Sequence, residues 1–159
     1  MGHAICRVPP FKENRSMEVK RVASVGIILI LVGLFTACSA PALSVSDVWA
    51  RPGTVDNNSA VYFVIDNPTA TEDVLLSASA TVAQAVELHE SMMDGDVMKM
   101  VPQENVPVPA GGEVQFKQGG LHVMLIGLTQ DLNPGDHFTV NLNFENAGEV
   151  TLDVEVKEP

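Results

Sequence analysis

The sequence predicts an all-β fold, a sandwich of short strands. From residue 44 onward, short runs in which apolar and polar side chains alternate recur along the chain, and this is the period of a half-buried strand. Turn-forming residues separate these runs, among them Asp66-Asn67-Pro68, Asp94-Gly95 and Asn133-Pro134-Gly135-Asp136. No stretch of this region keeps a helical hydrophobic period. Many short strands separated by turns are typical of a β-sandwich or barrel.

Each expected strand follows from this alternation. In 149–156 the even-numbered residues are Val or Leu and the odd-numbered ones are Glu, Thr or Asp, so one face is apolar. In 81–90 the apolar residues share one face and His89 lies on the other. In 121–128 His122 and Met124 likewise lie opposite the apolar face. The expected strands, in chain order, are 44–50, 59–66, 72–79, 81–90, 96–101, 113–116, 121–128, 137–144 and 149–156.

The N-terminal region predicts export. Residues 22–37 are an apolar run of sixteen residues that follows Lys20 and Arg21 and precedes small residues, which is the pattern of a secretory signal peptide. The run is shorter than the ~20 residues that a membrane-spanning helix needs. Residues 1–16 do not fit a signal peptide, so we interpret them as a mis-assigned start and Met17 as the natural one.

Cys38 directly follows this run, in the sequence Leu-Phe-Thr-Ala-Cys, which resembles the lipid-attachment site of bacterial lipoproteins. We therefore predict acylation of Cys38, which would hold the protein at a membrane surface. Cleavage after Ala42, which would release a soluble protein, is the alternative. The predicted organisation is a signal peptide at 1–37, a tether at 38–46 and a folded domain at 47–159.

Composition and charge agree with one exported domain. Residues 1–37 hold five of the nine Lys and Arg and two of the twenty Asp and Glu, so the remaining 122 residues carry a formal net charge of −14. Such a charge argues against nucleic acid as a partner, because nucleic-acid binding needs a basic surface. It favours solubility and the attraction of cations. Only one cysteine, Cys38, remains after the signal peptide, so no disulfide within the chain is expected.

Two histidines and two methionines, His89, Met100, His122 and Met124, are the strongest functional signal. Thioether sulfur is a soft donor that favours Cu(I), whereas hard cations prefer oxygen. His122 and Met124 stand two residues apart in an expected strand, so they share a face. A hairpin at Asp94-Gly95 would return Met100 towards His89. The pattern predicts a copper site of four ligands, drawn from three strands, at the rim of a sheet.

A methionine in a β protein is more often core filler than a metal ligand, and a single histidine is more often a surface residue. The distribution of methionine argues against core filling. Apart from Met1 and Met17, every methionine lies between residues 92 and 124. Core filling would scatter them. Met98 stands two residues before Met100, so both would lie on the same face of the expected strand, and Met98 is the candidate for an auxiliary ligand.

The spacing of these residues, His-x10-Met-x21-His-x-Met, resembles the signature of the periplasmic copper chaperones of the PCu(A)C family. The resemblance extends over residues 45–156. Five flanking segments carry it: VWARP (48–52), VELHE (86–90), VMKM (97–100), PAGG (109–112) and GLHVML (120–125). A match at four positions with agreeing flanks is more specific than a short motif alone.

The resemblance implies a cupredoxin-like Greek-key β-sandwich that binds Cu(I) through His89, Met100, His122 and Met124. It also implies a place in the periplasm or at the outer face of the cytoplasmic membrane. The implied acceptor is the copper site of a respiratory cytochrome oxidase, reached directly or through a thiol copper-assembly protein. Two other interpretations stay open: an exported protein that buffers copper or confers resistance, and a β-sandwich binding module without a metal.

Two rival classes fit poorly. A zinc hydrolase would need a second histidine after His89-Glu90, where the sequence has Ser91, Met92 and Met93. A blue-copper electron carrier needs a cysteine thiolate, and Cys38 precedes the first expected strand. We therefore do not expect an enzyme.

Overall fold

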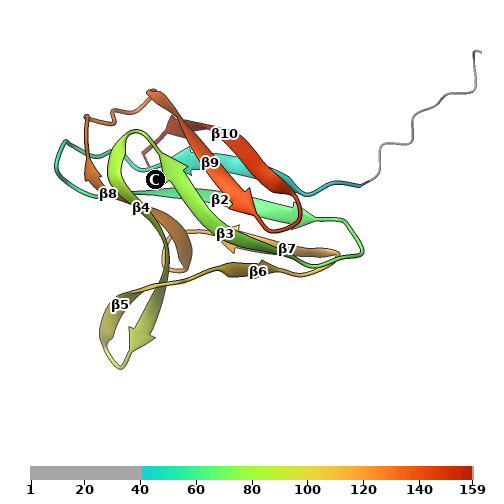
Figure 1. Cartoon of the computed structure of the whole chain (residues 1–159). Coiled ribbons are helices and arrows are strands. Elements are labelled where there is room, and N and C mark those ends of the chain that lie inside the picture. Colours follow the sequence, from blue (N-terminus) through green and yellow to red (C-terminus); the bar gives the residue numbers. More distant parts are fainter. Residues whose placement is uncertain (1–40, 159) are drawn as a thin grey trace, which may run out of the picture. The chain divides into compact units, whose positions relative to one another are not determined.

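Ten β-strands form in the computed structural model, which describes residues 41–158. They are β1 (Ser44–Ala50), β2 (Ser59–Asn67), β3 (Asp73–Ala80), β4 (Ala83–Asp94), β5 (Val97–Pro102), β6 (Val106–Val108), β7 (Gly112–Phe116), β8 (Leu121–Leu128), β9 (His137–Phe144) and β10 (Gly148–Val156). The prediction of an all-β fold is confirmed (Figure 1). In the described part of the chain no helix is long and apolar enough to cross a membrane.

The strands follow the order β5-β4-β8-β7-β2-β1-β10-β9-β3-β6, with β2 also pairing with β8. This ladder folds back on itself. One layer contains β4, β8, β2 and β7, and the other contains β10, β9, β3 and β6. β1 links the two layers because it pairs with β2 on one side and runs parallel to β10 on the other. Consecutive strands β3 and β4 lie in different layers, which is how a Greek-key sandwich is connected.

The core lies between the layers and is built from the apolar faces that the alternation predicts. The side chains of Leu152, Val154 and Val156 in β10 are buried, while alternate residues point to solvent. From the other layer, β8 contributes Val123 and Leu125, both fully buried. Because β4 and β8 each give one face to this core, their second face is free to build a site.

A β-bulge in β1 sets the position of Trp49. The pairing with β2 shifts between Ser46 and Trp49, and Asp47 within the bulge has a φ of 52°. Such a left-handed conformation is tolerated by Asp better than by most residues. After the bulge Trp49 stands directly opposite Tyr62 of β2, on the face away from the core.

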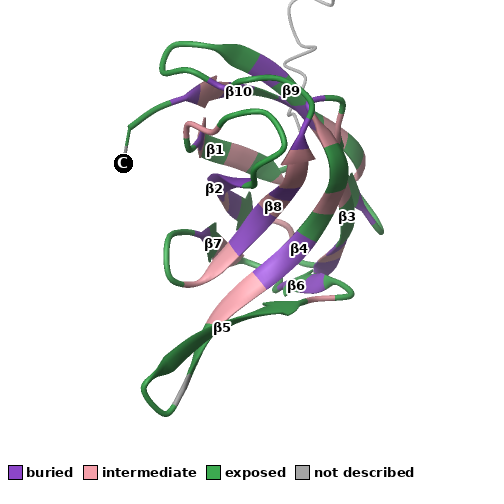
Figure 2. Cartoon of the chain, turned by 90° about the vertical axis from the view of Figure 1, so that its left-hand side faces the viewer, coloured by how far each residue is buried: buried purple, intermediate pink, exposed green. Residues whose placement is uncertain are grey.

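The β4–β5 hairpin projects from the body of the domain (Figures 1 and 2). Asp94 pairs with Val97, so Gly95 and Asp96 make a two-residue turn, and Gly95 has a φ of 63°. Glycine is favoured at the first central position of such turns because positive φ carries no Cβ penalty. All six residues of β5 are exposed, and β5 is an edge strand of the sheet.

The structure differs from the predicted strands at β4 and β6. β4 runs to Asp94, so His89 lies inside this strand and not at its end as predicted. β6 was not predicted; it is three residues long and pairs with β3. β1 has the predicted bounds, Ser44–Ala50, so its first residues belong to the segment that was also expected to be a tether, 38–46. The predicted signal peptide, the start at Met17 and the acylated Cys38 lie outside the described residues.

Candidate metal centre

His89 and His122 stand directly opposite each other on the antiparallel strands β4 and β8. Their ring centroids are 5.9 Å apart, and the two ring planes meet at 52°. Both residues are buried, with exposed fractions of 8% and 4%. Two imidazoles held side by side and shielded from water are a typical arrangement for binding a metal ion.

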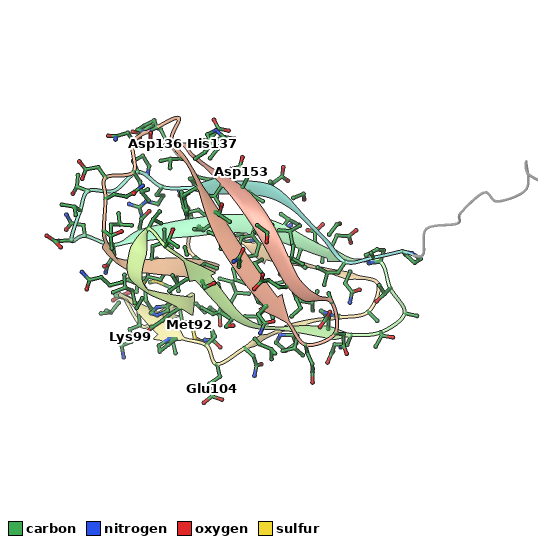
Figure 3. The ribbon with its side chains drawn as sticks, turned by 45° about the horizontal axis from the view of Figure 1, so that its top comes forward. Met92, Lys99, Glu104, Asp136, His137 and Asp153 are labelled. Carbon is green, nitrogen blue, oxygen red and sulfur yellow. The ribbon has the colours of Figure 1, made fainter. Side chains whose placement is uncertain are left out.

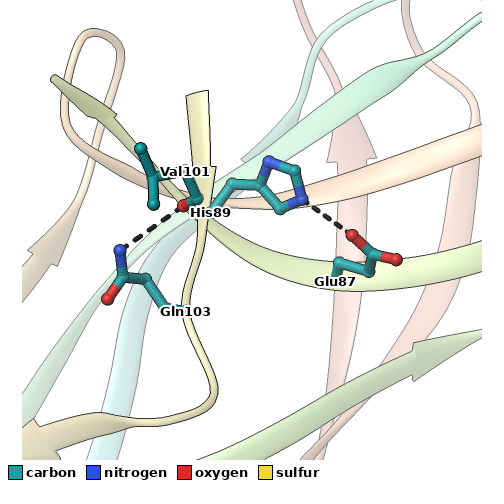
Figure 4. Close-up of polar contacts among 4 residues, drawn as sticks. All are labelled: Glu87, His89, Val101 and Gln103. Atoms are coloured by element: carbon teal, nitrogen blue, oxygen red, sulfur yellow. Dashed lines mark hydrogen bonds and ion pairs between the residues drawn. The ribbon is translucent and has the colours of Figure 1, made fainter. Parts of the chain in front are cut away.

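The ring of His89 is held by Glu87, its neighbour on the same face of β4. Nε2 of His89 lies 2.8 Å from Oε2 of Glu87, as Figure 4 shows. A carboxylate only accepts hydrogen bonds, so Nε2 of the neutral imidazole carries the proton and donates it. Nδ1 of His89 is then left with its lone pair, and this buried atom has no hydrogen-bond partner.

The ring of His122 is held by a backbone carbonyl. Its Nδ1 lies 3.0 Å from the oxygen of Gly120, two residues earlier in the chain. Because the carbonyl accepts, Nδ1 is the donor and Nε2 keeps its lone pair. Each histidine therefore has one nitrogen tied to a protein acceptor and the other available as a ligand, as is usual for metal-binding histidines.

The methionines lie on the same face as the histidines. Met124 stands two residues after His122 and opposite Glu87 of β4 and Ala60 of β2. Met100 of β5 stands opposite Ser91, which is two residues after His89. Met100 is therefore a diagonal neighbour of His89, at a separation that long side chains can bridge. The hairpin brings Met100 back to β4, as the sequence predicts.

A cleft of 440 Å³ opens above this face. Met98, Met100, His122 and Met124 line it, together with polar residues that include Arg51 and Ser91. His89 is not part of the lining; it lies beside His122, beneath the surface. The donor set is thus unequal in depth: the imidazoles are buried, whereas Met100 is 55% exposed and Met98 is 59% exposed.

Aromatic rings cover the other flank of His122. Its ring centroid is 6.5 Å from that of Tyr62, and Tyr62 lies 4.7 Å from Trp49. Tyr62 is only 5% exposed. Tyr62 therefore lies beside His122, and Trp49 packs on Tyr62.

The structure brings three predicted ligands, Met100, His122 and Met124, into one cleft and sets His89 beside them. The auxiliary candidate Met98 also lines the cleft. Sequence reasoning missed the parts played by Glu87 and Gly120. Each stands two residues before a histidine. Because residues two apart in a strand lie next to each other on one face, this spacing was the signal that could have found them.

His137 lies apart from this centre, at the start of β9. Its Nδ1 is 3.0 Å from Oδ2 of Asp153 across the β9–β10 pair, and both side chains are exposed (Figure 3). His137 is therefore a surface residue that contacts Asp153.

The fold is that of PCuAC domains. A copper-bound PCuAC domain from PmoF2 superposes with a TM-score of 0.63 at 24% identity, over 74% of this chain and 93% of that one. The solution structure of CuI-DR1885 from Deinococcus radiodurans has a TM-score of 0.55 at 28% identity, over 76% of this chain and 83% of that one. The prediction of a cupredoxin-like sandwich of the PCu(A)C type is confirmed by these likenesses.

The chain belongs to the family described as "Putative lipoprotein LpqE-like", whose model matches residues 43–156. Two relatives are similar over most of the domain. RP573 of Rickettsia prowazekii (strain Madrid E), an uncharacterised protein, is 33% identical over 114 residues, which cover 68% of this chain and 62% of that protein. "Putative lipoprotein Lxx21020" of Leifsonia xyli subsp. xyli (strain CTCB07) is 25% identical over 120 residues, which cover 75% and 72%. The match therefore spans less than two thirds of the Rickettsia protein.

Proposed function

We propose that this protein is an extracytoplasmic Cu(I) metallochaperone. The observation that carries the proposal is the pair of buried histidines whose free nitrogens, Nδ1 of His89 and Nε2 of His122, share a face with the sulfurs of Met100 and Met124. Two neutral nitrogens and two neutral thioethers suit a soft monocation. The likeness to PCuAC domains with bound copper supports the same conclusion.

The difference in depth between the ligands suits transfer more than storage. The imidazoles are fixed by Glu87 and Gly120 and are covered by protein. Met100 is more than half exposed and belongs to a projecting hairpin. An incoming thiolate or imidazole could replace the sulfur of Met100 first, while the histidines still hold the ion. The ion would then leave by one ligand exchange at a time, without a change of oxidation state.

We further propose that Cys38 carries a lipid and that the protein works in the periplasm, at the outer face of the cytoplasmic membrane. The family and one relative both carry the description "Putative lipoprotein", which supports the lipid attachment. The acceptor we propose is the copper site of a respiratory oxidase, reached directly or through a thiol protein. Buffering of copper without delivery is the alternative, and a transfer assay separates the two.

The binding test is an anaerobic titration of the protein with Cu(I) against a competing chelator. We expect one tight equivalent, which is lost when Met100 and Met124 are both replaced by Ala. The pair His122→Ala and Met124→Ala should also abolish the tight equivalent and leave the fold intact by circular dichroism. The chaperone proposal would be refuted if the wild type did not bind Cu(I) tightly, or if both double variants bound it as tightly as the wild type.

The transfer test mixes the copper-loaded protein with a copper-free oxidase domain and follows the absorption of the filled oxidase site. Transfer faster than the spontaneous release of Cu(I) to a chelator supports delivery. Transfer no faster than release supports buffering.

A further inference from the structure

We propose that Met93 and Met98 form a second, outer Cu(I) site on the β4–β5 hairpin, from which the ion passes inward through Met100. This inference rests on the proposed function, because it supplies the entry to the same centre. Met93 and Met98 stand directly opposite each other across the two strands. Side chains of such a pair have Cβ atoms about 4.5–5.5 Å apart, close enough for two thioethers to hold one ion.

The two faces of the hairpin differ in their chemistry. On the face shared with His89, the paired residues are Ser91 with Met100 and Met93 with Met98, so sulfur dominates. The reverse face pairs Glu90 with Val101 and Met92 with Lys99, so charged groups are mixed with apolar ones. A hairpin that only needed apolar residues for pairing would not place three of its four methionines on one face.

These methionines do not fill the core. Met93 is 64% exposed and Met98 is 59% exposed. Among the described residues, eight large hydrophobic side chains are exposed, and six of them lie on this hairpin. Figure 2 shows the hairpin as an exposed arm that leads to buried segments of β4 and β8. Exposed thioethers bury little area, so packing does not account for them, whereas metal binding needs them accessible.

The methionines of this face lead from the hairpin to the cleft, since Met93 is paired with Met98 and Met98 lines the cleft. Met98 and Met100 are two residues apart on β5, about 6.5–7 Å along the strand. Met98 and Met100 both line the cleft that contains Met124 and His122. Methionine has three rotatable bonds, so each thioether can reach towards its neighbour. A Cu(I) ion could form one new Cu–S bond inward for each outer bond that it breaks, and every ligand stays neutral throughout.

The test begins in a background that lacks the inner site, His122→Ala with Met124→Ala. Here we expect a residual equivalent of Cu(I), weaker than in the wild type, when the full-length protein is titrated anaerobically. The added pair Met93→Leu and Met98→Leu should remove it, because Leu has a similar volume but no donor. The matched control is Met92→Leu, which changes a half-exposed methionine on the reverse face of the same hairpin and should leave the residual equivalent in place.

A second measurement uses the wild-type protein, so it does not depend on how the background variant folds. With methionine methyl groups labelled with carbon-13, the first equivalent of Cu(I) should shift the NMR signals of Met100 and Met124. Excess Cu(I) should then shift Met93 and Met98 but not Met92.

The outcomes separate the two proposals. If the wild type binds no Cu(I) tightly, the chaperone proposal fails. If the wild type binds tightly but Met93 and Met98 do not respond to excess Cu(I), only the outer site is refuted. A residual equivalent that survives the two Leu substitutions, or that Met92→Leu removes equally, also overturns the outer site.

Discussion

Each histidine of the centre depends on one acceptor that fixes its proton. Glu87 is the more exposed of the two acceptors, since its side chain is 49% accessible, but its bond with His89 is short at 2.8 Å. We expect Glu87→Ala to lower the affinity for Cu(I) by about 10–100-fold, because a histidine without its outer partner loses its fixed orientation and some basicity. Competition titration against a Cu(I) chelator measures the change.

Glu90→Ala is the control for this substitution. Glu90 is on the same strand and has the same charge, but it stands on the reverse face, opposite Val101. Its removal should leave the affinity for Cu(I) nearly unchanged. Equal losses in the two variants would mean that negative charge, not orientation of His89, explains the effect.

Asp73 stabilises the opposite end of the domain by accepting hydrogen bonds from the backbone. Burial alone would raise the pKa of its carboxyl group, but bonds from the N–H groups of Asn146, Val74 and Ala147 outweigh burial and lower the pKa. A lowered pKa means that the folded state favours the carboxylate. The stabilisation is therefore present above the ordinary pKa of about 3.9 and is lost as the pH falls through the lower folded value.

The substitution Asp73→Ala tests this. At neutral pH the free energy of unfolding should fall by about 1–3 kcal/mol, because three partly buried N–H groups lose their acceptor. Urea unfolding at several pH values should show the difference from the wild type shrinking as the pH falls below about 4. A difference that is constant down to the lowest pH would exclude the carboxylate as its source. Cu(I) affinity should not change, since Asp73 is not among the residues that line the cleft.

At the scale of the element, the β4–β5 hairpin is stabilised by pairing and by its turn more than by burial. Gly95 has a φ of 63°, and a Cβ added there would meet no atom within 4 Å. Gly95→Ala therefore introduces backbone strain of about 1–2 kcal/mol without a clash. We expect a hairpin that opens more often, a lower Cu(I) affinity because Met100 leaves its place, and a melting temperature close to that of the wild type.

Gly148→Ala offers the matched comparison. Gly148 has a φ of 76° with open space around its Cα, but it begins β10, which contributes buried Val and Leu side chains to the core. The same strain should lower the melting temperature there and leave Cu(I) affinity intact. Thermal unfolding and chelator competition on both variants measure the two effects. If Gly95→Ala lowered the melting temperature and Gly148→Ala lowered the Cu(I) affinity, the proposal that a marginally stable hairpin holds Met100 would be contradicted.

The elements also show what alternation can and cannot predict. The bounds of β8 and β9 coincide with the predicted runs, because each has one face in the core and a turn on both sides. β6 was missed, since three residues around Pro107 are too few to show a period. β4 was predicted to end at residue 90, where the alternating run ends. The strand continues to Asp94 by pairing with β5, although Ser91, Met92 and Met93 are not buried.

The site was predictable as residue types and spacing, but its depth was not. Strand parity indicates that His89 and His122 face away from the core, yet both are buried. His122 has beside it the ring of Tyr62, which belongs to β2 and is distant in the sequence, and His89 has beside it the ring of His122. A pattern within one strand carries no information about what another strand places over it.

At the scale of the whole molecule, we expect copper binding and folding to be linked, since the proposed ligands come from β4, β5 and β8 and converge only in the folded domain. A ligand that binds only the folded state stabilises it by RT ln(1 + [L]/Kd), about 2.7 kcal/mol at a free concentration a hundred times Kd. For a domain of this size, that raises the melting temperature by about 10 °C.

Scanning calorimetry under anaerobic conditions, with free Cu(I) set by a chelator, should show this rise in the wild type and its absence in the Met100→Ala and Met124→Ala variant. Val123→Ala separates stability from binding, because Val123 is fully buried on the core face of β8, between His122 and Met124 in sequence. This variant should start from a lower melting temperature, since a buried cavity lowers stability. Cu(I) should nevertheless raise its melting temperature by as much as that of the wild type, because the face of β8 that carries His122 and Met124 is unchanged. If Cu(I) did not raise the melting temperature of Val123→Ala, the two faces of β8 would not be independent. The division of this strand into a packing face and a ligand face would then be wrong.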